Sequence, residues 1–193
     1  SLYFFSTSAL VGLYSAASSL IESVWIIATG ISPIVLSKIS NTGDTDFNRS
    51  ITLTLAKASL FLSTLAVVVV YFLPNELFTY LLGKDFSPIK GVMLWIAPGI
   101  LFISFSTIIS HYFSGLGKLK FIAFCNFCGF AITLALAPFL IKLYGVKGAA
   151  FVANCSYGIS SLALFIGFAI NAKLKLREVF NFSKDIENIK KAF

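Results

Sequence analysis

Residues 9–37 read ALVGLYSAASSLIESVWIIATGISPIVLS, an apolar run in which Glu22 is the only charged side chain. A helix needs about 20 mainly apolar residues to cross the ~30 Å hydrocarbon core of a bilayer. The run exceeds that length, has no basic start and is interrupted by Glu22, so it does not fit a secretory signal peptide. We therefore expect a membrane-spanning helix here, and not a cleaved leader.

Four further runs of the same kind follow. Hydrophobic residues make up 58% of the chain and charged residues 12%, whereas a soluble domain carries about 25% charged residues. The runs are too long for strands and do not alternate strictly. We predict an all-α, polytopic transmembrane bundle of five spans over residues 1–172, followed by a cytoplasmic tail over 173–193. The further spans are expected at 51–73, 89–115, 121–141 and 148–171.

The net charge of the chain is +7, and the positions of its basic residues predict the topology in the membrane. The basic residues lie at the ends of the spans and not on one soluble face, so nucleic acid is not an expected partner. With Ser1 outside, most of the 15 Lys and Arg residues fall in inside segments, as the positive-inside rule requires. We expect the N-terminus outside, the C-terminus in the cytoplasm and the lipid bilayer as the surroundings.

The segments between and after the spans carry their own patterns. Lys38–Ser50 is polar and predicts a loop. In the stretch after Pro74 an apolar stripe predicts a short helix lying at the outer interface and ending at Gly83. A second stripe predicts an amphipathic helix on the inner leaflet, with a frayed chain end as the alternative. The first stripe comprises Leu77, Phe78, Leu81 and Leu82, and the second Phe182, Ile186, Ile189 and Phe193.

Glu22 and Lys57 are the charged candidates for a substrate or ion cavity. Counting the helical rise from Lys38 places Glu22 near the middle of the bilayer, where a carboxylate costs about 2.5–3.5 kcal/mol. Glu22 should therefore face protein or water, either exchanging a proton during transport or serving as a neutral packing group. Lys57 either snorkels to the inner interface or faces the cavity and an anionic ligand such as a lipid phosphate.

Asn126 and Asn154 are further cavity candidates, and Pro98 and Pro138 are candidates for bends. Asparagines inside spans either line a cavity or join helices by hydrogen bonds. Each proline removes a backbone hydrogen bond and bends its helix. The two bends, at similar depth, predict either an outer gate or a static kink that fits the bundle.

No metal, cofactor or enzymatic centre is expected. Cys125 and Cys128 form a C-x-x-C inside an apolar span, without the four ligands that zinc needs. His111 has no second ligand at a suitable spacing and is expected near the inner interface. The outer loops carry only Glu76 and Asp85 as acids, so a membrane-embedded enzyme is the weaker class.

Several motifs occur in a characteristic order, and together they resemble the polysaccharide exporters. These are the O-antigen and capsule-type flippases of the multidrug/oligosaccharidyl-lipid/polysaccharide superfamily, and the likeness covers roughly residues 8–170. The motifs are VGLYSAA at 11–17, Glu22, SPIVLSKIS at 32–40, LLGKDF at 81–86, GLGK at 115–118 and YGVKGAA at 144–150.

The resemblance implies a two-lobe transporter of a dozen or more helices in the bacterial cytoplasmic membrane. Its members pass an undecaprenyl-diphosphate-linked oligosaccharide from the inner to the outer leaflet by alternating access. The five spans would be most of the second lobe, with the first lobe of the same chain as their partner. The start at Ser1 without Met and the outside N-terminus both fit a fragment. A multidrug or lipid II exporter and a non-transporting scaffold subunit remain the alternatives.

Overall fold

The computed structural model describes residues 2–174, with side chains from residue 10 onward. Every regular element in that range is helical, and five helical segments are long and apolar enough to cross a membrane. The predicted all-α bundle of five spans is confirmed, and the chain is a multi-pass membrane protein. The spans cover Leu10–Asn41, Thr45–Phe72, Ile89–Gly115, Leu119–Tyr144 and Val146–Asn171.

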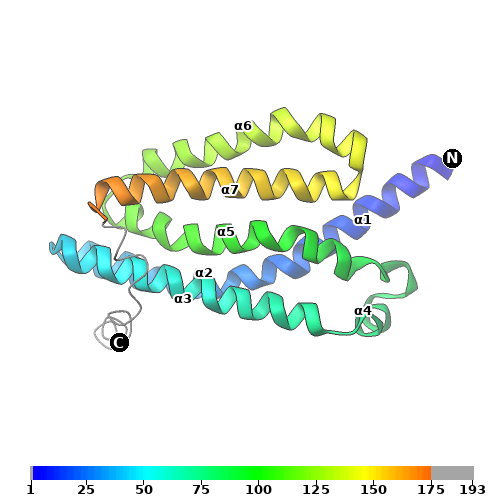
Figure 1. Cartoon of the computed structure of the whole chain (residues 1–193), viewed down its shortest axis with the longest axis horizontal. Coiled ribbons are helices and arrows are strands. Elements are labelled where there is room, and N and C mark those ends of the chain that lie inside the picture. The colour runs from blue at the N-terminus through cyan, green and yellow to red at the C-terminus, as the bar shows by residue number, and fades with distance from the viewer. Residues whose placement is uncertain (1, 175–193) are drawn as a thin grey trace.

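Successive spans run in opposite directions, as Figure 1 shows. The turns between α2 and α3 and between α5 and α6 lie with the end of α7 at one end of the bundle, here called the α2–α3 end. The N-terminus, the short helix α4 and the α6–α7 turn lie at the other, the α4 end. The elements are α1 (Leu2–Glu22), η1 (Ser23–Trp25), α2 (Ile26–Asn41), α3 (Thr45–Phe72), α4 (Asn75–Leu82), η2 (Lys84–Phe86), α5 (Ile89–Gly115), α6 (Leu119–Tyr144) and α7 (Val146–Asn171).

The first span is not one uninterrupted α-helix, although its sequence predicts a single run. The 3₁₀ turn η1 separates α1 from α2 directly after Glu22. The Ser23 hydroxyl donates to the Leu20 carbonyl at 2.6 Å, a local bond that competes with regular helix geometry. Trp25 anchors the turn to α5 by donating from Nε1 to Thr107 Oγ1 at 2.8 Å. A 3₁₀ stretch within a long helix often marks a hinge.

Helix α5 is the centre of the bundle, and α6 lies at its edge. In α5, 56% of the most apolar window is buried, against 11% in α6. α5 packs against α1, α2, α3 and α7, whereas α6 packs mainly against α7. Figure 1 shows α6, α7, α5 and α3 side by side in that order. The outer face of α6 therefore meets lipid or another protein surface.

Two apolar clusters form the core, one toward each end of the bundle. Val35, Ile51, Ile108, Phe113 and Phe168 belong to the cluster at the α2–α3 end. The cluster at the α4 end includes Leu13, Ile21, Phe78, Ile89 and Ile96. Serines are buried on α3 (Ser59 and Ser63) and on α5 (Ser104), and the Ser59 hydroxyl joins the two helices by donating to the Ser104 carbonyl at 3.2 Å. Small residues of this kind let membrane helices approach closely.

The connections between spans are shorter than the sequence suggests. The loop predicted over Lys38–Ser50 is wrong, because α2 continues to Asn41 and α3 begins at Thr45. The Asp44 carboxylate caps α3 by accepting from the amides of Asp46 and Phe47 at 2.9 and 3.1 Å.

The short helix expected after Pro74 is present as α4, with Phe78 buried against the core. It ends at Gly83, whose φ of +100° favours glycine. The amphipathic helix predicted over Phe182–Phe193 lies outside the described residues.

Candidate functional site

A polar recess of about 460 Å³ lies between η1 and the middle portions of α5, α6 and α7. Eight of its 14 lining residues carry a hydroxyl group. We call this cavity the hydroxyl recess. Its polar and aromatic-polar side chains are Trp25, Ser106, Thr107, Ser110, His111, Asn126, Thr133, Ser156, Tyr157, Ser160 and Ser161.

Helical spacing gathers these groups on one side of each helix. On α5, Ser106 and Ser110 are four residues apart and so share a face. On α7, Ser156 and Ser160 repeat the same spacing. Asn126 from α6 completes the lining opposite α5. Three helices thus turn polar stripes toward one space.

Hydrogen bonds within the bundle account for many of the hydroxyl protons. Thr107 donates to the Ile103 carbonyl at 2.7 Å while accepting from Trp25. Ser156 donates to the Gly129 carbonyl at 2.8 Å, and Ser161 donates to the Phe102 carbonyl at 2.9 Å. A hydroxyl that donates its single proton keeps acceptor capacity. The walls of the recess therefore remain able to accept hydrogen bonds from a bound molecule.

Three lining residues have unused donors as well. Within the described part of the chain, the side chains of Ser110, Ser160 and Asn126 form no hydrogen bond. His111 also lines the recess, with its Nδ1 3.0 Å from the Thr107 carbonyl oxygen. The hydroxyl and amide groups of the recess accordingly offer neutral donors and acceptors together.

Glu22 lies beside the recess. It precedes Trp25 by three residues, about one helical turn, and its side chain is exposed. Trp25 lines the recess, whereas Glu22 itself is not among the lining residues. The structure therefore places a carboxyl group about one helical turn from a recess residue, next to the 3₁₀ interruption of the first span.

The remaining candidates from the sequence are distributed differently. Asn126 lines the recess, but Lys57 and Asn154 do not. Lys57 is half-buried on α3. Pro98 lines a second, apolar cleft of about 400 Å³ between α3, α5 and α7, which shares Ser161 with the recess and has Phe102 and Phe165 among its walls. Pro138 is exposed on α6.

Asn154 bonds to the backbone of α5 on both sides of Pro98. Its Oδ1 accepts from the Gly99 amide at 2.8 Å, and its Nδ2 donates to the Trp95 carbonyl at 2.8 Å. A regular helix would pair these two backbone groups with each other. A side chain inserted at a kink satisfies both, which matches the interhelical interpretation of Asn154. The outer gate at the two prolines stays a prediction.

The hydroxyl recess itself was not predicted from the sequence. Ser106, Thr107, Ser110 and His111 form a continuous polar face on α5, and this spacing was the available signal. The signal is weak in a membrane helix, because serine and threonine commonly bond their own helix backbone there. Only the convergence of three helices distinguishes a lining from isolated hydroxyls.

The described residues contain no group of three or more His, Cys, Asp or Glu side chains able to hold a metal ion. Cys125 is buried in the core cluster at the α2–α3 end, and its thiol is free. A comparison with known proteins finds no matching family model, curated protein or solved structure. The hydroxyl and amide groups of the recess can exchange hydrogen bonds with a neutral, polyhydroxylated molecule.

Proposed function

We propose that this chain is part of a membrane transporter that flips a lipid-linked oligosaccharide across the bacterial cytoplasmic membrane for surface polysaccharide biosynthesis. The carrier in this proposal is undecaprenyl diphosphate, and the movement proceeds by alternating access. The five spans form most of one lobe, with the N-terminus outside and the C-terminus in the cytoplasm. A second lobe of the same chain supplies the facing half of the cavity. The observation that carries the proposal is the hydroxyl recess.

The recess suits a sugar because many of its side chains are hydroxyl or amide groups, which can both donate and accept hydrogen bonds. A polar group left unsatisfied in hydrocarbon costs several kcal/mol. Ser110, Ser160 and Asn126 avoid that cost if water or a polar cargo occupies the recess. Sugar hydroxyls, like these side chains, both donate and accept. The exposed indole of Trp25 adds an aromatic surface with its polar nitrogen already bonded to Thr107.

In this proposal Glu22 is the acid that couples the movement to an ion gradient. A charged carboxylate at membrane depth is costly, and protonation removes the charge. Because Glu22 directly precedes the η1 turn, and Trp25 of that turn lines the recess, a change in its charge acts where the first span is already irregular. The resemblance of residues 11–40 to the polysaccharide exporters supports the same assignment.

One observation favours a second candidate, a multidrug exporter of the same superfamily. An acid at the edge of an intramembrane cavity attracts organic cations as well as exchanging protons. The hydroxyl-rich lining favours the oligosaccharide, whereas Glu22 is compatible with both. A drug-susceptibility assay on the same strains separates them, since a multidrug exporter protects cells from cationic dyes and a flippase does not.

The test is complementation in a bacterial strain whose own flippase gene is deleted. The gene that encodes this chain is introduced as the original sequence, as Glu22→Gln and as Glu76→Gln. Glu76 is exposed on α4, so its variant removes one acid far from the recess. We expect Glu22→Gln to lose most surface polysaccharide and to accumulate the lipid-linked precursor, while Glu76→Gln retains activity at equal protein level. Full activity of Glu22→Gln would favour the scaffold interpretation and remove the role of Glu22.

A further inference from the structure

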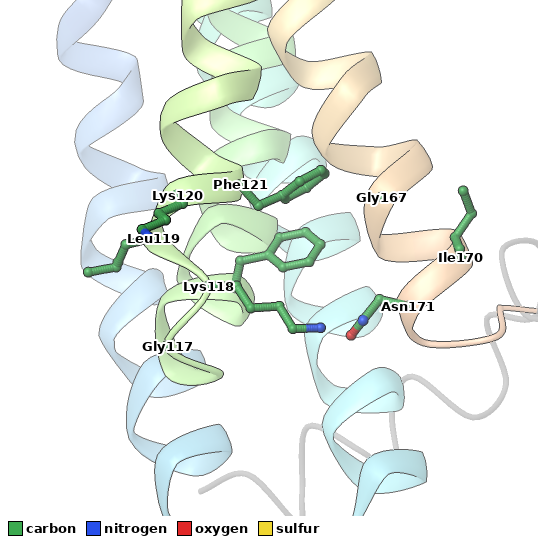
Figure 2. A pocket seen from close by; sticks show the side chains of 9 residues that line it. Gly117, Lys118, Leu119, Lys120, Phe121, Gly167, Ile170 and Asn171 are labelled. Atoms are coloured by element: carbon green, nitrogen blue, oxygen red, sulfur yellow. The ribbon is translucent and has the colours of Figure 1, made fainter.

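A second cavity, of about 830 Å³, lies at the α2–α3 end, where the α5–α6 turn meets the end of α7. Figure 2 shows Lys118 and Phe121 on one side of it and Ile170 and Asn171 on the other. It shares no lining residue with the hydroxyl recess. Since α5 ends at Gly115 and α7 at Asn171, the cavity lies at the level where the spans leave the membrane.

The polar part of this cavity is positively charged. Lys118 and Lys120 both line it, and both are exposed. No acidic side chain is among its lining residues in the described part of the chain. Figure 2 shows the Lys118 ammonium group pointing across the cavity toward Asn171. The lining therefore favours an anion at the membrane boundary.

Asn171 is held so that it presents donors. The Tyr112 hydroxyl donates to Asn171 Oδ1 at 3.2 Å. The Tyr112 ring is itself fixed edge-on against Phe168, with 4.9 Å between the ring centroids. With its oxygen engaged, the Asn171 side chain offers its NH₂ group to a ligand. An ammonium and an amide donor thus face the same space.

The rest of the cavity lining is apolar, and its aromatic rings are closely packed. The Phe121 ring lies so close to Gly167 that a Cβ there would clash with it. The Phe113 ring packs on Phe121 with 4.7 Å between the centroids. One helical turn further along α6, Phe124 is 63% exposed on the membrane face of the bundle. An apolar wall thus leads from the basic end of the cavity toward the lipid.

We propose that this cavity binds an anionic phospholipid of the surrounding bilayer. Lys118 and Asn171 bind the phosphodiester, Lys120 adds to the local positive charge, and an acyl chain lies against Phe121 and along α6. A soluble anion would use the basic end only, whereas a phospholipid also uses the apolar wall. The site is independent of the hydroxyl recess, so the proposal stands whether or not the chain transports an oligosaccharide.

The experiment uses the full chain in nanodiscs of phosphatidylcholine that contain a graded fraction of photoactivatable phosphatidylglycerol. We expect crosslinks concentrated within residues 117–121 and 167–171. The double variant Lys118→Gln/Lys120→Gln should reduce crosslinking on the order of tenfold. The matched control Lys84→Gln/Lys142→Gln removes the same charge from exposed lysines at the α4 end and should leave crosslinking unchanged.

Two further arms keep the result unambiguous. Lys118→Arg/Lys120→Arg preserves the charge and should restore crosslinking, which separates lost binding from misfolding. Glycerol phosphate added in excess should compete poorly, because it lacks the acyl chain. Equal crosslinking of phosphatidylcholine and phosphatidylglycerol, crosslinks elsewhere on the chain, or equal loss in the control pair would overturn the proposal. Efficient competition by glycerol phosphate would also overturn it, by showing a soluble-anion site.

Discussion

Asn154 Oδ1 accepts a 2.8 Å hydrogen bond from the backbone amide of Gly99. This bond, with the one from Asn154 Nδ2 to the Trp95 carbonyl, places a side chain of α7 into the backbone of α5 beside Pro98. Gly99 permits the approach, because a Cβ at that position would lie 2.6 Å from Asn154 Oδ1. The hydrogen-bond ladder of the central helix is thus interrupted beside its own proline and completed by a side chain of a neighbouring helix.

Asn154→Leu should lower the free energy of unfolding by about 1–3 kcal/mol. Hydrogen bonds between membrane helices contribute about 0.6–1.7 kcal/mol each, and this substitution removes two while leaving two backbone groups exposed by the bend. Thermal or denaturant unfolding in detergent measures the change. Asn126→Leu is the matched control, since Asn126 is exposed and makes no hydrogen bond with the described residues. Equal effects of both substitutions would refute the role of these two bonds.

Gly99→Ala should destabilise the bundle by about 1–3 kcal/mol, the usual cost of excess volume in a packed site. Its added methyl group meets both Asn154 and the Tyr157 ring. Gly91→Ala, in the same helix, meets nothing within 4 Å and should be neutral or stabilising by up to about 1 kcal/mol. Comparing the two unfolding midpoints tests the close approach, and a neutral Gly99→Ala would contradict it.

The hydrogen bond from Trp25 to Thr107 should couple the η1 turn to α5. In a double-mutant cycle of Trp25→Phe and Thr107→Val, we expect a coupling of about 0.5–1.5 kcal/mol, the net worth of a typical hydrogen bond. Thr107→Ser keeps the acceptor oxygen and should preserve the coupling. If Trp25 and Thr107 prove additive in unfolding experiments, the contact does not hold the turn.

The spans were predictable because each depends on a local property, the length of an apolar run. The ends of the helices were less so. Asp44 begins α3 through two backbone contacts, and this extends the helix into a polar segment that hydropathy assigns to a loop. The interruption after Glu22 was not predictable, since it involves Trp25 meeting a threonine 82 positions away.

The residues of the candidate site, like the helices, were predictable only in part. Glu22 and Asn126 stood out in the sequence because a charge or an amide is rare within an apolar run. Ser106, Ser110 and Ser160 did not stand out, because a hydroxyl in a membrane helix is ordinary. Their importance comes from the packing of α5, α6 and α7 around one space, which is a tertiary property.

The hydroxyl recess should be accessible to water, and cysteine labelling tests this. The three native cysteines, Cys125, Cys128 and Cys155, are first replaced by alanine. In this background Ser110→Cys and Ser160→Cys should react with a charged, membrane-impermeant methanethiosulfonate. The reaction is run in detergent-free membranes with the reagent present on both sides. Phe127→Cys and Leu134→Cys are the controls. Both positions are more than 60% exposed on α6, and neither lines the recess.

A thiolate forms readily only in contact with water, so exposure to hydrocarbon gives little labelling. We therefore expect modification of the two recess cysteines at least tenfold faster than of the two α6 cysteines. A polyhydroxylated competitor held in the recess should slow the former and not the latter. Similar slow rates at all four positions would mean that the recess is dry, and a dry recess could not carry a sugar across the membrane.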